Sequence, residues 1–412
     1  MADLLWPGDE RAGQTFSSAH VLRAMVQVEQ EWLRALVEHG TAPVDAAVAL
    51  PPVGDADVEE VAIGAEAGGT PVVPLLSLLR KRLGEGPAST WLHRGLTSQD
   101  VVDTALVLAA RETTRTLLTD VDAIVAALCG LAERHRGDVM VGRTLTQHAV
   151  PITFGLKAAQ WLQGVLDARD DLRRLRFPVQ VGGAAGTRAA AVELGGDPGA
   201  QVAALAEALG LEDALPWHTT RTPLTRYADS LVRTTDALGH VVNDVLLLSR
   251  PEIGELAEPA ATGRGGSSTM PHKANPVLAV LVHRAALTAP GLAAQLHLAA
   301  AAAVDERPDG AWHTEWSTLA TLSRRTLVAA SQSVELLDGL RVHTDRMAAM
   351  AAAHRDGLLA ERGSIRDAVG LAPEREPEQT REPDRDEPAD YLGAADRFVD
   401  QIIRRAGEEV PT

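Results

Sequence analysis

Apolar residues recur every three or four positions along most of the chain, a pattern that predicts amphipathic α-helices. The first such segment covers residues 17–39, and Gly40 is suited to ending it. A second helix is expected to start near Asp57, and a third covers residues 74–83. The apolar positions of the first helix are Val21, Met25, Val28, Trp32 and Leu36.

Longer periodic segments dominate the rest of the chain. The segment that begins at Thr97 keeps its apolar stripe to about Arg134, and a stripe of that length needs partner helices. Thr97 and Asp100 are spaced as a capping pair at its start. No segment is predicted to be a β-strand, so the expected fold class is all-α, a long-helix bundle. Further helices are expected at residues 152–176, 198–210, 224–249, 277–304 and 312–340.

The pattern also divides the chain into three expected parts. Residues 1–90 form an N-terminal helical domain, and residues 91–355 form the central long-helix domain. Residues 356–412 form a reduced C-terminal region. Within it, residues 373–388 hold four prolines and ten charges, a composition that predicts a disordered acidic linker. A short terminal helix, residues 389–405, is expected to dock back.

Charge and cysteine usage limit the possible partners. The formal net charge is −17, whereas a nucleic-acid-binding protein needs a basic surface. The chain has one cysteine, Cys129, which excludes an intramolecular disulfide and fits a reducing compartment. No signal peptide is visible, and no apolar run looks long enough to span a bilayer. We therefore expect a cytoplasmic protein with no nucleic-acid or membrane partner.

The polar loop at residues 263–276, GRGGSSTMPHKANP, carries the most chemistry. Ser267 lies on a glycine-rich tether, and such a loop can carry a hydroxyl onto a bound substrate when it closes. Lys273 and Asn275 can bind a carboxylate, the lysine as a charge and the asparagine as a directional donor. The alternative is a solvated Gly/Ser linker.

Two more polar segments precede predicted long helices. Thr97 and Ser98 lie at a helix N-terminus, which can bind an anion, although capping alone also explains Thr97. Arg143, Gln147 and His148 lie just before the helix at residues 152–176. An imidazole can act as an acid or a base near neutral pH, although a lone histidine is more often structural. The Gly-rich residues 177–187 lack the context of a dinucleotide site and are interpreted as a tight loop.

With these segments in view, the chain resembles the fumarase/aspartase superfamily. Residues 266–276 resemble its signature loop, and residues 97–104 and 142–148 are similar to two of its other blocks, in the same order. The resemblance covers about residues 15–355. It implies a homotetramer with a central multi-helix core and active sites that are each built from three subunits.

Within the superfamily, the local sequence is most similar to bacterial 3-carboxy-cis,cis-muconate cycloisomerases. Leu145 stands where fumarase and aspartase carry a catalytic histidine, and His148 falls where adenylosuccinate and argininosuccinate lyases have theirs. Two positions, Ala274 and Met350, depart from residues common in relatives, which have arginine and asparagine there. The resemblance implies cofactor-free, metal-free cycloisomerisation of a small polycarboxylate to a lactone.

The resemblance also implies a role for each matched residue. Ser267 would exchange the proton α to a carboxylate, with Lys273 stabilising charge and His148 as the second acid or base. The substrate-binding residues would be Thr97, Ser98, Arg143, Gln147, Ser268, Met270, His272 and Asn275. Two alternatives stay open. One is a β-elimination lyase acting on a substituted succinate of the adenylosuccinate, argininosuccinate or nitrosuccinate type, and the other is a catalytically silent helical scaffold.

Overall fold

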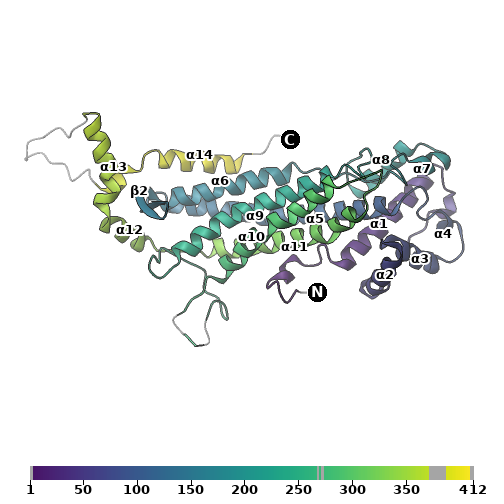
Figure 1. Ribbon diagram of the computed structural model, residues 1–412, viewed down its shortest axis with the longest axis horizontal. Coiled ribbons are helices and arrows are strands. Elements are labelled where there is room, and N and C mark those ends of the chain that lie inside the picture. The colour runs from purple at the N-terminus through teal and green to yellow at the C-terminus, as the bar shows by residue number, and fades with distance from the viewer. Residues whose placement is uncertain (1–2, 267–268, 271–272, 371–386, 409–412) are drawn as a thin grey trace, which may run out of the picture. The chain divides into compact units, whose positions relative to one another are not determined.

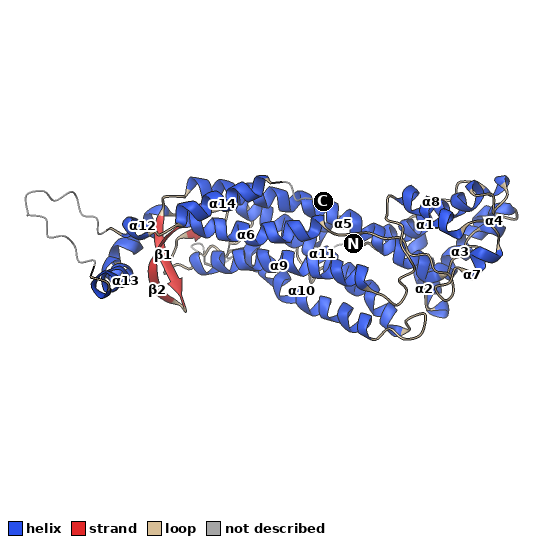
Figure 2. Ribbon diagram, turned by 90° about the horizontal axis from the view of Figure 1, so that it is seen from above, coloured by secondary structure: helices blue, strands red, loops and turns tan. Residues whose placement is uncertain are grey.

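The structure of the protein is a computed structural model that describes residues 3–266, 269–270, 273–370 and 387–408. Helices supply nearly all of its regular structure, and the strands are short (Figures 1 and 2). The predicted all-α fold class is confirmed, and α5 alone runs for 37 residues. The predicted linker lies almost wholly at residues 371–386, outside the described residues.

The bounds of the elements follow the predicted helices closely, with ends that differ by less than one turn for most of them. The elements of the first half are η1 (Asp9–Ala12), α1 (Ser18–Glu38), η2 (Val44–Ala46), α2 (Asp55–Gly68), α3 (Val72–Leu83), α4 (Pro87–Trp91), α5 (Ser98–Arg134), β1 (Val139–Thr144), β2 (Gln147–Thr153) and α6 (Phe154–Arg173). Those of the second half are α7 (Ala189–Glu193), α8 (Pro198–Leu209), α9 (Thr222–Leu248), β3 (Leu256–Ala257), α10 (Val277–Ala301), α11 (Gly310–Asp338), β4 (Arg341–Val342), α12 (Thr344–Ala353), α13 (Arg355–Ala368), η3 (Pro388–Tyr391) and α14 (Ala395–Gly407).

The chain folds into two compact units, and each draws on three separate segments. Unit 1 consists of Met1–Leu118, Leu172–Arg233 and Leu287–Val328. Unit 2 consists of Thr119–Asp171, Thr234–Ala286 and Ala329–Thr412. The domains expected at residues 1–90, 91–355 and 356–412 divide the chain in a different way, and that division stays a prediction.

Unit 1 is built on a buried ion cluster. Arg221 donates to Asp103 through both terminal nitrogens, at 2.7 and 2.9 Å, and to Glu315 at 2.6 Å. All three side chains are at most 2% exposed. Burial by itself lowers the pKa of Arg221, but the two carboxylates outweigh it and raise that pKa, so the guanidinium stays charged. Burial raises the pKa of Glu315, and Arg221 opposes that change.

Unit 2 contains a β-hairpin, and the expectation of no strands was wrong there. Strands β1 and β2 pair antiparallel, with Arg143 opposite His148 and Thr144 opposite Gln147. Leu145 and Thr146 form the connection, both with positive φ, 48° and 68°. Two-residue hairpin turns of this kind favour asparagine and glycine, which are absent here. The turn therefore gave no recognisable signal in the sequence.

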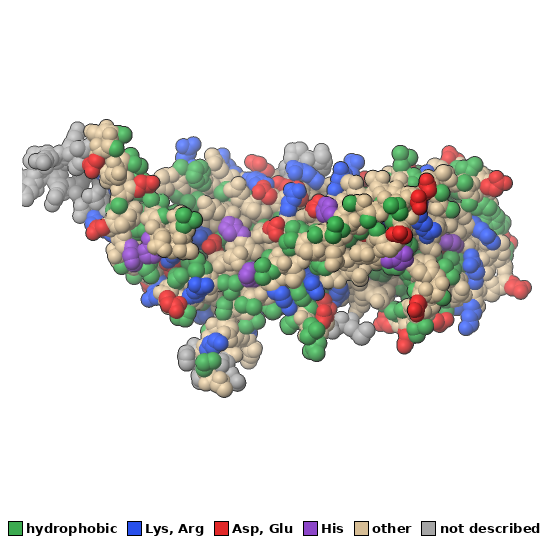
Figure 3. Space-filling model, in the orientation of Figure 1, with side chains coloured by type: hydrophobic (Ala, Val, Ile, Leu, Met, Phe, Trp, Pro, Cys, Tyr) green, Lys and Arg blue, Asp and Glu red, His purple; other side chains and the backbone are tan. Residues whose placement is uncertain are grey.

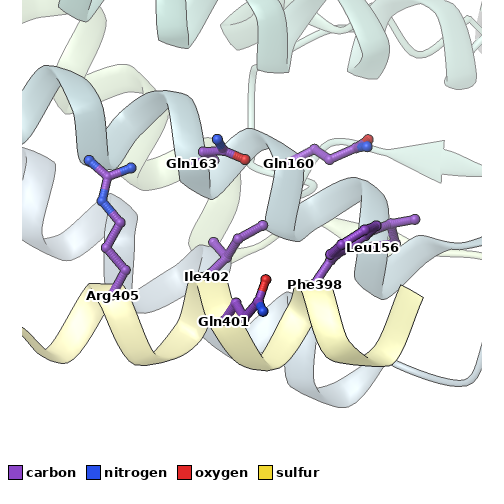
Figure 4. A pocket seen from close by; sticks show the side chains of 7 residues that line it. All are labelled: Leu156, Gln160, Gln163, Phe398, Gln401, Ile402 and Arg405. Atoms are coloured by element: carbon purple, nitrogen blue, oxygen red, sulfur yellow. The ribbon is translucent and has the colours of Figure 1, made fainter. Parts of the chain in front are cut away.

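The terminal helix docks on unit 2, as predicted, although it begins later than residue 389. On α14, Arg405 pairs with Asp167 and Asp170 of α6, at 2.7 and 2.8 Å. Both helices line a cleft of about 400 Å³, in which Phe398 lies beside Leu156 (Figure 4). Its lining residues are Leu156, Gln160, Gln163, Phe398, Gln401, Ile402 and Arg405.

Helix α10 contradicts the expectation that no apolar run is long enough to span a bilayer. Val277–Ala301, 25 residues, is long and apolar enough to cross a membrane by length and composition alone. A third of its most apolar 18-residue segment is buried, and Leu287 and Leu298 are each 70% exposed. One such helix is weak evidence for a membrane span, because helices of soluble cores and subunit interfaces have the same composition.

The ion cluster makes a prediction about stability. Arg221→Met would leave Asp103 and Glu315 buried without a counter-charge, and we expect the free energy of unfolding to fall by about 3–5 kcal/mol. Urea denaturation followed by circular dichroism measures this change. Glu315→Gln serves as the comparison and should cost less, because Arg221 keeps both bonds to Asp103. An unchanged midpoint for Arg221→Met would contradict the argument.

Candidate active site

The first candidate segment is the N-terminus of α5, in unit 1. The Asp100 carboxylate accepts from the Thr97 backbone N–H at 2.9 Å, which confirms the predicted capping pair. It also accepts from the N–H groups of Gly182 and Gly183, at 2.8 and 3.0 Å, and contacts Nε2 of His218 at 2.7 Å. Asp100 therefore fixes both the helix start and the Gly-rich loop.

That Gly-rich loop approaches its neighbours as closely as the sequence suggested. A Cβ on Gly182 would lie 2.6 Å from Cε1 of His218, so a larger residue does not fit. Gln180 donates to Asp103 at 3.2 Å and accepts from the N–H of Trp217 at 2.9 Å. The loop therefore braces the start of α5, where Thr97 and Ser98 are half-buried and the first-turn N–H groups favour an anion.

The second candidate segment is the β1–β2 hairpin, in unit 2. The Arg143 guanidinium binds both oxygens of Glu255, at 3.0 and 2.8 Å, and Glu255 is fully buried. The charge of Arg143 is thus already compensated by a residue that the sequence gave no reason to select. Gln147 is exposed and donates to Thr146 at 3.4 Å.

His148 lies on the exposed side of the hairpin and packs against a second histidine. The rings of His148 and His354 meet edge to face, with centroids 4.3 Å apart and planes at 86°. A patch of histidine side chains lies on the surface over α12 (Figure 3). Burial lowers the pKa of His148, and the nearby His354 and Arg143 lower it further against the opposing effect of Glu255. The imidazole is therefore neutral near pH 7 and able to accept a proton.

The third candidate segment is the polar loop, also in unit 2. The carbonyl of Gly265 accepts from both the backbone N–H and the side-chain amide of Asn275, at 2.8 and 3.0 Å. Beside it, Arg264 pairs with Glu335 at 2.6 Å. These bonds close the base of the loop, and the role of Asn275 in binding substrate stays a prediction.

The remaining loop residues can be placed only in part. Lys273 and Met270 are exposed, and the N–H of Lys273 donates to the carbonyl of Met270 at 3.0 Å. Ser267, Ser268 and His272 lie outside the described residues. Their roles stay predictions.

The structure therefore distributes the candidates over both units. Unit 1 holds Thr97 and Ser98, and unit 2 holds the rest of those described, namely Arg143, Gln147, His148, Met270, Lys273 and Asn275. Sequence reasoning did not select Asp100 and His218 as a pair, nor Glu255 or His354. The polar residues at 217–221, WHTTR, which include His218 and come just before the predicted helix at residues 224–249, are a signal that could have indicated part of this set.

The fold and these segments define a lyase of the fumarase/aspartase superfamily. A family described as "Lyase" matches residues 68–291, more than half of the chain, and the chain belongs to it. Among solved structures, the 3-carboxy-cis,cis-muconate lactonizing enzyme of Pseudomonas putida has a TM-score of 0.84 and 32% identity, over 96% of each chain. A fumarate lyase of Mesorhizobium sp. BNC1 has a TM-score of 0.81 and 28% identity, covering 96% of this chain and 97% of that one.

Relatives with named reactions differ in substrate. The nitrosuccinate lyase of Streptomyces davaonensis is 40% identical, over 96% of this chain and 92% of its own length. A 3-carboxy-cis,cis-muconate cycloisomerase of Pseudomonas aeruginosa is 37% identical, over 96% and 83%. An N-acetyl-S-(2-succino)cysteine lyase of Dickeya dadantii is 33% identical, over 82% and 75%. The names of these three relatives therefore describe three different reactions.

The closed base of the loop makes a second prediction. A Cβ on Gly265 would lie 2.6 Å from the Asn275 carbonyl oxygen, so Gly265→Ala should loosen the loop and lower stability by about 1–3 kcal/mol. The matched control is Gly263→Ala, which has a similar positive φ but nothing within 4 Å of the added carbon. Thermal melting and limited trypsin digestion at Arg264 and Lys273 should separate the two variants. Equal cleavage rates would refute the closure.

Proposed function

We propose that the protein is a cofactor-free lyase that moves a proton at the carbon α to a carboxylate while a bond at the neighbouring carbon forms or breaks. The observation that carries the proposal is the exposed His148 imidazole beside His354, in a chain that also keeps Lys273 in the superfamily loop. Ser267 is the proposed group that exchanges the α-proton. Neither a metal nor an organic cofactor is required.

The charges favour a small polycarboxylate as substrate. With a net charge of −17, the chain as a whole repels anions, so binding needs local donors. Lys273 supplies an exposed ammonium, and Thr97 and Ser98 lie at a helix N-terminus, which favours a carboxylate. Removing the α-proton places a second negative charge on the carboxylate, and fixed donors of this kind stabilise it.

The proposed reaction is the interconversion of 3-carboxy-cis,cis-muconate and its carboxymuconolactone. A carboxylate oxygen adds to the conjugated alkene, and a proton is added at the carbon α to another carboxylate, which closes the lactone. The likeness to the Pseudomonas putida lactonizing enzyme over 96% of each chain supports it. The proposal includes a cytoplasmic homotetramer whose active sites are shared between subunits. The candidate residues lie on two units of the chain, which is compatible with such shared sites.

A second reaction is favoured by a specific observation. The 40% identity to a nitrosuccinate lyase extends over 92% of that protein, whereas 83% of the Pseudomonas aeruginosa cycloisomerase is covered. In this elimination, a base removes the proton α to one carboxylate of nitrosuccinate. The carbon–nitrogen bond of the adjacent carbon breaks, which yields fumarate and nitrite. The same loop and the same histidine would serve both reactions.

Substrate assays distinguish these reactions. Purified protein is incubated with 3-carboxy-cis,cis-muconate or with nitrosuccinate. Loss of the conjugated-diene absorbance is expected for the cycloisomerase, and colorimetric nitrite with equimolar fumarate is expected for the elimination. Turnover of the muconate alone supports the first proposal, and turnover of nitrosuccinate alone replaces it with the second. Turnover of neither substrate favours the silent scaffold.

The proposed role of Ser267 leads to a further prediction. Ser267→Ala should reduce kcat by about 10²–10⁴-fold without changing the oligomeric state, because the α-proton loses its exchange partner. Steady-state kinetics and size-exclusion chromatography measure these two quantities. Thr269→Ala, which removes another hydroxyl from the same loop, is the control and should retain activity. Wild-type turnover by Ser267→Ala would eliminate the assigned role.

A further inference from the structure

A second histidine lies beside the proposed acid/base group. His354 joins α12 to α13, and its backbone carbonyl accepts from the N–H of Leu358 at 3.1 Å. Leu358 is 1% exposed and packs with Val141 and Ala351 in an apolar cluster. The backbone of His354 is therefore anchored in unit 2, between two helices that pack against the hairpin.

The ring of His354 is also fixed. Its Nδ1 lies 3.0 Å from the carbonyl oxygen of Met350. A carbonyl oxygen only accepts, so Nδ1 carries the hydrogen and the lone pair of the neutral ring lies on Nε2. The edge-to-face contact with His148 thus joins a held ring to one on an exposed strand.

His148 depends on that contact more than on hydrogen bonds. Within the described part of the chain, its ring nitrogens make no hydrogen bond, which leaves them open to a ligand. Both rings border a cavity of about 360 Å³ together with Arg355 and Asp356. Stacking with a fixed aromatic neighbour restricts the ring orientations of His148.

We infer that His354 is a positioning residue, which holds the His148 ring in one orientation and, by its proximity, disfavours protonation of that ring. The inference rests on the proposed function of His148 as acid or base. Two imidazolium ions whose centroids are 4.3 Å apart repel each other, so their protonation is coupled. The lowered pKa of His148, caused first by burial and next by His354, agrees with this arrangement.

Other charged groups also face His148 and influence the protonation of its ring. Arg143 from β1 and Glu255, just before β3, act on it with opposite signs. Arg355 and Asp356 from α13 line the shared cavity, and η3, which carries Asp390, packs against β2. Arg143 and Glu255 neutralise each other as a bidentate pair, which leaves His354 as the neighbour whose charge acts most on the His148 ring.

The test compares His354→Phe with His354→Ala. Hydrogen–deuterium exchange at histidine C2, read by mass spectrometry across pH on the full-length protein, gives the titration midpoint of His148. Both variants should raise that midpoint towards the ordinary value of 6.5. The shift should be larger for alanine, because phenylalanine keeps the burial and removes only the charge.

Kinetics supply the second readout. Because His148 acts as a base in its neutral form, a raised midpoint moves the acidic limb of the kcat/KM profile to higher pH. We expect kcat to fall about tenfold at the pH optimum in His354→Ala, with KM little changed, as is typical when a catalytic group is misaligned. His343→Ala, an exposed histidine at the start of α12, is the control and should match wild type.

The outcomes separate this inference from the proposed function. A His148 midpoint in His354→Ala equal to that of wild type overturns the inference, whatever the activity. A raised midpoint in a protein that turns over neither substrate supports the coupling and contradicts the proposed reaction. A raised midpoint with unchanged kcat limits His354 to an electrostatic effect and overturns its positioning role.

Discussion

Burying two carboxylates one turn apart at the start of α5 is the constraint that organises unit 1. Asp100 and Asp103 are both fully buried, and a buried charge is tolerated only when donors surround it. The donors come from the Gly-rich loop, from the segment before α9 and from α11, whose Trp312 indole N–H donates to Asp103 at 2.9 Å. Each of these segments must therefore lie against α5, which leaves Thr97 and Ser98 at a fixed helix end.

Unit 2 also compensates a buried carboxylate, but with a single arginine. Glu255 is buried against Arg143, and this pair fixes the hairpin that carries His148. The polar loop is closed at its base by Asn275, so its reactive segment starts and ends at one place. Among the described residues, Arg143 and Asn275 are bonded within the unit, whereas the side chains of His148 and Lys273 are exposed.

The relatives differ in the substrates and reactions that their names give. Loss or gain of a proton next to a carboxylate is common to elimination and to lactone formation, because both pass through a charge that the same donors stabilise. Which bond at the neighbouring carbon reacts depends on the shape of the substrate pocket. The chain belongs to the lyase family, and substrate assays decide which reaction it performs.

The sequence by itself determined the all-α class, the bounds of the long helices and the family, because apolar periodicity and short motifs are local properties. It did not predict α12 and α13, the helices on either side of His354. It also located the capping pair at Thr97 and Asp100. It could not show the hairpin, whose turn at Leu145 and Thr146 uses residues with no turn preference. Nor could it pair Asp103 with Arg221, Arg143 with Glu255, or His148 with His354. Those partners are far apart in the chain, and only tertiary packing decides which of these side chains come into contact.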